Sequence, residues 1–280
     1  MWKKYLILTK PGIIFGNVIT AIGGFLLASR QQFDAEKFFG MSIGLALIIA
    51  AACVFNNYKD RKIDSMMKRT QKRPFVTGSI SVMRALIFGC TLLLLGIVTM
   101  AITTNFYATG SALAGFIFYV FVYTPMKVKS VHGTLIGSIS GAMPPVVGYT
   151  AVSCRLDLAS LLLFSIVAIW QMPHFYAIAL YRMEEYAKAS IPVLPLIKGV
   201  KKTKMQMLYY TIAFCAVSLL PTILGYTSLT YLYMAIGCDL LWLYCCFKGF
   251  NQRCYIPWAR TMFKSSILVI TVLSFSFYLN

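Results

Sequence analysis

The segment Val54–Pro74 concentrates charge in a chain that is 59% hydrophobic and only 12% charged. Within it, Asn56, Asp60 and Asp64 recur at i, i+4 and i+8, so on a continuous helix they project from nearly the same face. Carboxylates about 6 Å apart repel one another unless a cation lies between them. The spacing therefore predicts a cation site. Mg²⁺, bound by a few carboxylates and completed by water and a substrate phosphate, is the ion typical of such a site.

Basic residues surround these aspartates, and they suggest the partner of the cation. A diphosphate bridged to the aspartates by Mg²⁺ would leave oxygens free, and arginine guanidinium groups suit such oxygens. The alternative is an ordinary basic loop at a membrane surface, with aspartates paired to arginines. The basic residues concerned are Arg61, Lys62, Lys68, Arg69, Lys72 and Arg73.

The elements that must position this segment are membrane spans. A soluble domain carries about 25% charged residues, twice the share found here. A spanning helix needs about 20 apolar residues, and nothing in the pattern alternates as in a barrel. We therefore expect an all-α integral membrane protein, a single polytopic domain over residues 1–280, with nine transmembrane helices. The predicted spans are Ile13–Ala28, Phe38–Phe55, Ala85–Ile102, Phe106–Tyr123, Gly133–Ala151, Leu158–Leu180, Met207–Gly225, Leu229–Phe247 and Met262–Leu279.

The net charge of +18 is distributed as a membrane protein distributes it. The amino-terminal segment and the loops after the second, fourth, sixth and eighth spans, counted with the start of span nine, hold 23 of the 26 Lys and Arg residues; Arg30, Lys37 and Arg155 are the others. Cytoplasmic loops collect basic residues, so we expect a cytoplasmic amino terminus and no nucleic-acid partner. The alternative, a cleaved signal peptide over Met1–Ala28, fits this asymmetry less well.

Two motifs in Val54–Pro74 now identify a family. The stretch NNYKDRKIDSMMKRTQKRP resembles the NxxxDxxxD…RTxxRP signature of the intramembrane prenyltransferases of the UbiA superfamily. The resemblance implies a UbiA-type bundle of nine helices in which the aspartates hold Mg²⁺ and an isoprenyl diphosphate. The residues on motif positions are Asn56, Asp60, Asp64, Arg69 and Arg73.

Three further stretches are similar to the protoheme IX farnesyltransferases, also called heme O synthases. They are YLILTKPGIIFGNVITAIGGFLLAS, GTLIGSISGAMPPVVGY and WQMPHFYAIALYRMEEYAKASIPVLP. This resemblance runs from about Tyr5 to Pro195 and thins out beyond it. It implies transfer of a farnesyl group from farnesyl diphosphate to a vinyl group of heme B in a bacterial cytoplasmic membrane. It also suggests a terminal oxidase or a heme A synthase as partner.

The resemblance also assigns roles to residues outside the first motif. Glu185 stands where the family usually has an aspartate, and it could hold a second Mg²⁺ or a basic residue. Arg182 could contact a phosphate or a heme propionate. His174 lies inside the sixth span, where ionisable residues are functional candidates; it could ligate heme iron, orient the porphyrin, or hydrogen-bond to a neighbouring helix. Diphosphate-binding roles fall to Arg61, Arg69, Arg73, Lys127 and Lys129, although Val128 separates the two lysines.

Two alternatives stay open. Relatives with a quinone or chlorin acceptor carry a second DxxxD motif, which this chain lacks at the corresponding place. A secondary transporter would place ionisable residues near the bilayer midplane, where only Asp239 is expected here.

Overall fold

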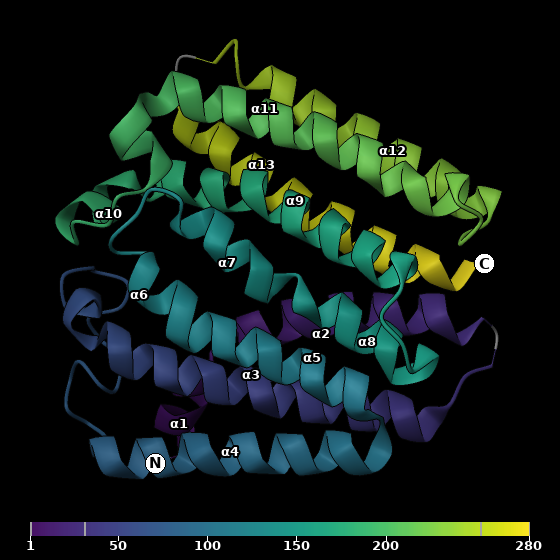
Figure 1. Ribbon diagram of the computed structural model, residues 1–280. Helices are drawn as coiled ribbons and strands as arrows, with labels where there is room; N and C mark the ends of the chain where they lie inside the picture. The colour runs from purple at the N-terminus through teal and green to yellow at the C-terminus, as the bar shows by residue number, and fades with distance from the viewer. Residues whose placement is uncertain (1, 31, 253, 280) are drawn as a thin grey trace.

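The computed structural model describes residues 2–30, 32–252 and 254–279, and this part of the chain is helical without strands (Figure 1). Nine of its helical segments are long and apolar enough to cross a membrane, so the nine predicted spans are confirmed. They are formed by α2 (Pro11–Ser29), α3 (Ala35–Asp64), α4 (Val82–Thr103), α5 to α6 (Phe106–Met126), α7 and α8 (Gly133–Ser153), α9 (Leu158–Tyr181), α11 (Leu194–Ile223), α12 (Leu229–Lys248) and α13 with the 3₁₀ turn η2 (Tyr255–Leu279).

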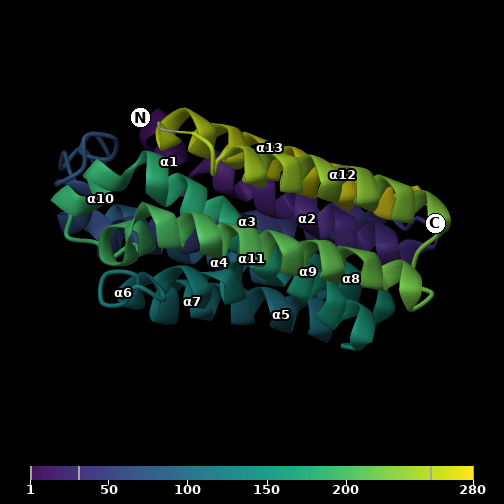
Figure 2. The same ribbon diagram turned by 90° about the horizontal axis from the view of Figure 1, so that it is seen from above.

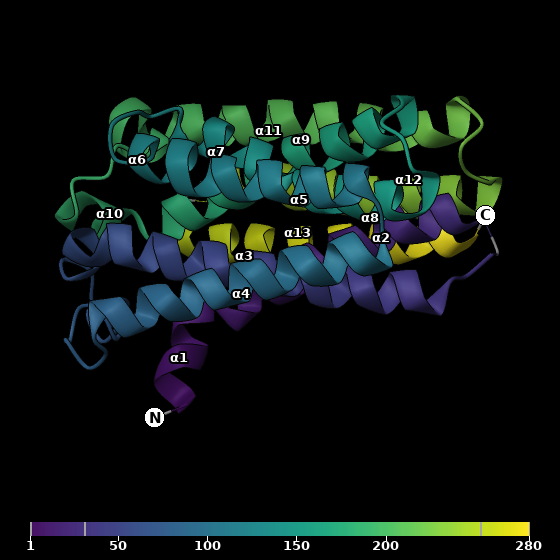
Figure 3. The same ribbon diagram turned by 60° about the horizontal axis from the view of Figure 1, so that its bottom comes forward.

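Two short helices lie outside these spans. Helix α1 (Trp2–Thr9) precedes α2 and leaves the bundle at an angle (Figure 3). Helix α10 (Met183–Lys188) follows α9 and precedes the turn into α11. Both lie near charged segments of the chain, and α10 carries Glu184 and Glu185 in its first turn.

Several helices extend beyond the apolar runs that predicted them. Helix α11 begins at Leu194, although the prediction placed the seventh span from Met207. The added residues include four lysines (198, 201, 202 and 204), which hydropathy alone excludes from a span. Gly199 there has φ 80° and ψ 164°, so the helix is kinked within its charged start.

The fourth and fifth spans are irregular, each for a local reason. The fourth passes from α5 (Phe106–Ile117) through a π-helical segment, η1 (Phe118–Tyr123), into α6 (Thr124–Met126). The fifth is interrupted at Ala142, between α7 (Gly133–Gly141) and α8 (Met143–Ser153), where Pro144 and Pro145 lie in the first turn of α8.

Helices α2 and α8 pack closely, and small residues make the approach possible. A Cβ atom on Gly24 would lie 1.9 Å from the carbonyl oxygen of Pro145, and one on Gly148 would lie 1.8 Å from that of Ala21. Each glycine therefore lies against the backbone of the other helix, as in small-residue packing between membrane helices. An alanine at either position would force the two helices apart.

The bundle has two distinct ends. The end of α3, α6 and α10 lie together at one end of the bundle in both Figure 1 and Figure 2. The loop between α8 and α9 and the loop between α11 and α12 lie at the other end. The segments that follow the second, fourth and sixth predicted spans hold 16 of the 26 basic residues, so positive charge gathers at the first end.

Candidate active site

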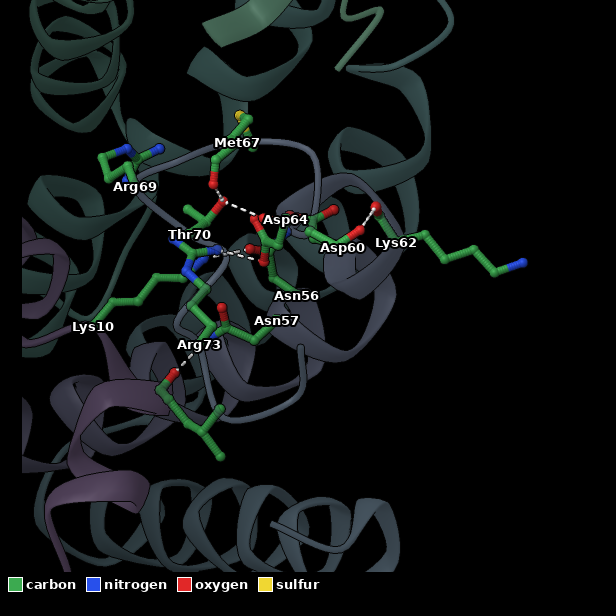
Figure 4. A network of polar contacts seen from close by, with 12 residues as sticks. Lys10, Asn56, Asn57, Asp60, Lys62, Asp64, Met67, Arg69, Thr70 and Arg73 are labelled. Carbon is green, nitrogen blue, oxygen red and sulfur yellow. Dashed lines mark hydrogen bonds and ion pairs between the residues drawn. The ribbon is translucent and has the colours of Figure 1, made fainter. Parts of the chain in front are cut away.

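The three predicted ligands lie on one helix and are buried. Helix α3 continues past its apolar run to Asp64, as the spacing required. Asn56, Asp60 and Asp64 are only 1%, 5% and 3% exposed, in a chain whose other charged groups are mostly at the surface. Figure 4 shows them in one polar network at the end of α3. A buried carboxylate is costly unless a cation compensates it, so each aspartate must have a positive partner.

Each aspartate does have such a partner, and the two partners come from different segments. The Nζ of Lys127, at the end of α6, pairs with Oδ2 of Asp60. The Nη1 of Arg73 lies 2.6 Å from Oδ2 of Asp64. The side chains of Lys127 and Arg73 are 19% and 18% exposed, so these ion pairs are largely shielded from solvent. Both bases therefore lie beside the aspartates, and their diphosphate-binding role stays a prediction.

The loop after α3 is folded so that Arg73 returns to Asp64. The buried Thr70 donates its hydroxyl hydrogen bond to the carbonyl oxygen of Asp64 over 2.8 Å and caps the end of α3. Successive turns then join Met67 to Thr70 and Thr70 to Arg73. A helix end leaves carbonyl groups unpaired, and this hydroxyl satisfies one of them. The turns place the guanidinium over the carboxylate nine residues earlier.

Asn56 connects two further segments to the site. Its Oδ1 accepts a 2.6 Å hydrogen bond from Nζ of Lys10, and its Nδ2 donates to Oγ1 of Thr124 over 3.1 Å. Thr124 in turn donates to the carbonyl oxygen of Tyr119 over 2.7 Å, within the π-helical segment. The Asn56 amide is therefore oriented by contacts on both sides, with its oxygen toward the amine of Lys10.

Lys10 is a site residue that the sequence interpretation missed. It lies between α1 and α2 with φ 52° and ψ 70°, a left-handed conformation uncommon for lysine. Burial of its amine lowers the pKa of Lys10 from 10.5 to about 8. The sequence around Lys10 shows only that it directly precedes Pro11, the first residue of α2. Its contact with Asn56, 46 residues away in the chain, could not be predicted from that.

Glu185 lies with arginines rather than with the aspartates. Its Oε2 is 3.8 Å from Nε of Arg69 and 3.6 Å from Nη1 of Arg182. Burial and the nearby charges of Arg182 and Arg73 lower the pKa of Arg69. Within the described residues no three His, Cys, Asp or Glu side chains form a group that could hold a metal ion. Of the two partners predicted for Glu185, the basic residue is the one it has.

Two of the predicted diphosphate ligands point elsewhere. Arg61 donates from Nη1 to the carbonyl oxygen of Tyr58 over 2.8 Å, with its guanidinium carbon 4.3 Å from the Tyr58 ring centre. Lys129 is exposed. Between the two lysines, Val128 packs against Met67 and other buried residues. This apolar contact explains why Lys127 faces the site and Lys129 does not.

His174 is engaged between helices. Its Nδ1 is 2.7 Å from Oγ of Ser266 on α13, and its ring stacks on Trp170 with the centres 4.6 Å apart. The hydrogen bond to a neighbouring helix, one of the alternatives from the sequence, is thus present. Asp239 accepts a hydrogen bond from Ser218 over 2.8 Å, on the side of the bundle formed by α11 and α12.

Comparisons with known proteins extend this picture beyond the motifs. A model of the UbiA prenyltransferase family matches residues 17–268. The chain is 47% identical over 274 residues to the protoheme IX farnesyltransferase of Protochlamydia amoebophila (strain UWE25), covering 98% of this chain and 97% of that protein. It is 46% identical over 275 residues to the protein of the same name from Yersinia pseudotuberculosis serotype O:1b (strain IP 31758), covering 98% and 93%. These alignments cover nearly the whole chain and therefore continue beyond Pro195.

Solved structures show the same fold at low sequence identity. That of a digeranylgeranylglyceryl phosphate synthase has a TM-score of 0.80 at 23% identity, covering 99% of this chain and 97% of that one. That of a UbiA homolog from Archaeoglobus fulgidus bound to DMAPP and Mg²⁺ has a TM-score of 0.74 at 16% identity, covering 99% of both chains.

Proposed function

The chain belongs to the UbiA prenyltransferase family and is an enzyme, and we propose that it transfers a farnesyl group from farnesyl diphosphate to a vinyl group of heme B, giving heme O. The observation that carries the proposal is the pair of buried aspartates, Asp60 and Asp64, each matched by a cation at one end of the bundle. The acceptor is supported by near-full-length similarity to proteins named protoheme IX farnesyltransferase.

The donor set at the end of α3 suits Mg²⁺. Asp60, Asp64 and Asn56 offer carboxylate and amide oxygens, which are ligands that Mg²⁺ accepts. When bound, Mg²⁺ would neutralise the diphosphate and help it depart as a leaving group. The Archaeoglobus fulgidus homolog, with the same fold, binds both DMAPP and Mg²⁺. We do not assign Glu185 to this set, because it comes from α10 and lies between Arg69 and Arg182.

The bases around the aspartates would receive the diphosphate. Arg73 and Lys127 now compensate the carboxylates, and once a cation does so they are free to turn their N–H groups to phosphate oxygens. Lys10 and Arg69 add two further positive groups at the same end. Preorganised donors of this kind stabilise charge that develops on a leaving group. The proposal therefore keeps Arg69, Arg73 and Lys127, adds Lys10, and drops Arg61 and Lys129.

The reaction then balances as follows. The allylic C–O bond breaks and its electron pair leaves with the diphosphate. The π electrons of the heme vinyl group form a carbon–carbon bond to the farnesyl cation. Water adds to the cation so formed and loses a proton, which gives the hydroxyethylfarnesyl group of heme O. Exclusion of bulk water until the carbon–carbon bond exists would prevent hydrolysis of the farnesyl cation.

Heme would approach from the side of α9 and α10. Arg182, 29% exposed at the end of α9, is available to a propionate or a phosphate. His174 uses Nδ1 for Ser266, so iron ligation would have to use Nε2. The product would pass to a heme A synthase or a terminal oxidase.

The concentration of basic residues at the end of the bundle that holds Asp60 and Asp64 supports an orientation with the site facing the cytoplasm. The bacterial relatives support a bacterial cytoplasmic membrane. Both substrates are largely apolar, whereas the diphosphate must stay near water. An apolar bundle with a charged end meets both requirements.

The direct test is to incubate purified protein with Mg²⁺, heme B and farnesyl diphosphate and to detect farnesylated heme by mass spectrometry. Asp60→Asn and Asp64→Asn should abolish the product while the variants remain folded, and Lys129→Gln, which neutralises a charged residue at an exposed position, should retain it. Product only with a quinone or chlorin acceptor would reassign the acceptor. Transport of a labelled solute into vesicles, unaffected by Asp60→Asn, would favour a transporter.

A further inference from the structure

A pocket of about 260 Å³ opens at the end of the bundle opposite to Asp60 and Asp64. It lies between the end of α2, the end of α8 and the loop that joins α11 to α12. Its lining residues are Leu27, Ala28, Arg30, Tyr149, Val152, Ser153, Arg155 and Tyr226. The pocket thus combines two guanidinium groups with an apolar wall and two phenol rings.

Positive charge is scarce at this end of the chain, which makes the pocket unusual. Only Arg30, Lys37 and Arg155 of the 26 basic residues belong to it. Two of these three line the pocket. The basic residues of a membrane protein gather at one end, so a pair at the other end calls for a local reason.

The three cations differ in how they are compensated. Lys37 pairs with Asp34 at 3.3 Å, and Arg155 pairs with Asp157 at 2.9 Å. Within the described residues Arg30 has no acidic partner and no side-chain hydrogen bond. Arg30 also ends α2 in a left-handed conformation, with φ 36° and ψ 56°, where glycine or asparagine is the usual residue. The pocket therefore holds one uncompensated guanidinium.

Arg155 can serve the same ligand as Arg30. Only its Nε donates to Asp157, which leaves the other N–H groups of a five-donor guanidinium free. Asp157 is the acidic partner of Arg155, and its oxygens also accept from Tyr149 and the backbone of Ser160. Among the residues that line the pocket, two are arginines and none is acidic.

The size and position of the pocket indicate the class of ligand. Pockets for drug-sized ligands measure roughly 300–1,000 Å³, so this one suits a headgroup and is too small for a porphyrin. Arg30 follows the last residue of a span, the level at which lipid headgroups lie. Guanidinium groups bind phosphate oxygens through paired N–H donors. Leu27 and Val152 would contact the apolar part of the same molecule.

We propose that this pocket binds the phosphate group of a phospholipid, with Arg30 as its principal contact and Arg155 as the second. The phosphate would lie between the two guanidinium groups, and the start of the acyl chains would lie against α2 and α8. The site is separate from the prenyl-transfer site and does not depend on the proposed function.

Binding of phosphatidylglycerol to delipidated, full-length protein tests the proposal by native mass spectrometry. Arg30→Gln should weaken retention of the lipid about tenfold, because a charge-assisted hydrogen bond is lost. Arg30→Lys should retain part of it. Lys37→Gln, which removes the same charge at the same end but does not line the pocket, should bind as the wild type does.

Equal retention by the wild type and Arg30→Gln, or an equal loss in Lys37→Gln, would overturn the site. Binding of glycerol 3-phosphate, measured in the same way, distinguishes a lipid site from a site for a soluble phosphate. It should bind far more weakly than the lipid, because it lacks the apolar part. Binding of glycerol 3-phosphate as tight as that of the lipid would overturn the assignment to a phospholipid. Thermal unfolding of each variant in detergent checks that lost binding is not lost folding.

Discussion

Arg73 lies nine residues after Asp64 in the chain, and its Nη1 is 2.6 Å from Oδ2 of this carboxylate, which is only 4% exposed. The pair couples the loop after α3 to the helix that carries the candidate metal ligands. Within the proposal, the same guanidinium stabilises Asp64 before the substrates arrive and the diphosphate afterwards.

Replacing Arg73 separates these two roles. We expect Arg73→Gln to lower kcat about 10²-fold, as loss of one preorganised donor does, and to destabilise the fold by roughly 3–5 kcal/mol, because Asp64 stays buried and uncompensated. The double variant Asp64→Asn/Arg73→Gln should recover much of the stability but none of the activity. Denaturation and farnesylation assays on the wild type, Arg73→Gln and the double variant check this. A double variant no more stable than Arg73→Gln would disprove the coupling.

Lys127 and Lys129 should behave differently although they are two residues apart. Lys127 pairs with Asp60, whereas Lys129 is exposed. We expect Lys127→Gln to reduce kcat about 10²-fold and Lys129→Gln to change it less than about twofold, because a lone surface charge contributes little. Steady-state kinetics with farnesyl diphosphate compare them. Equal losses would place Lys129 at the diphosphate after all.

His174 and Ser266 should be energetically coupled across α9 and α13. Their 2.7 Å contact predicts a coupling energy of about 0.6 kcal/mol, so that the double variant His174→Ala/Ser266→Ala costs less than the sum of the two single variants. Unfolding in detergent measures this cycle. The absorption spectrum of bound heme B provides the second measurement. A spectral change with His174→Ala alone would assign iron contact to His174, and strictly additive losses would remove the predicted coupling.

Asp157 should stabilise the start of α9 in a pH-dependent way. Burial by itself raises its pKa, but hydrogen bonds from Tyr149, Ser160 and Arg155 outweigh it and lower the pKa below the ordinary 3.8. A carboxylate with a depressed folded-state pKa stabilises fully above its unfolded value, and the contribution is lost as the pH falls through the folded value. Asp157→Ala should therefore cost about 1 kcal/mol at pH 7, as loss of a cap does, and much less near pH 3. An equal cost at both pH values would contradict this.

The local spacing on α3 was enough to predict the centre of the site. Asn56, Asp60 and Asp64 belong to one helix, so an i, i+4, i+8 pattern fixes their common face without knowledge of the rest of the fold. The nine spans follow from apolar runs for a similar reason, since a span is a local property of the chain.

The partners of these residues could not be predicted in the same way. Lys10 reaches Asn56 over 46 residues, and Lys127 reaches Asp60 over 67, so their contacts depend on how whole helices pack. Family resemblance supplied Lys127 but not Lys10. Glu185 was assigned two alternatives because a sequence cannot show whether a carboxylate faces a metal or an arginine. The charged start of α11 was missed because a hydropathy criterion excludes its lysines and so places the start of the span after them.

Calorimetric titration of farnesyl diphosphate into the purified protein, with Mg²⁺ and with EDTA, measures whether Asp60 and Asp64 hold a cation that in turn holds the diphosphate. We expect tight binding to the wild type only with Mg²⁺, and loss of this dependence in folded Asp60→Asn and Asp64→Asn variants. Binding equally tight in EDTA, or a Mg²⁺ dependence that survives in both variants, would show that these aspartates hold no such cation.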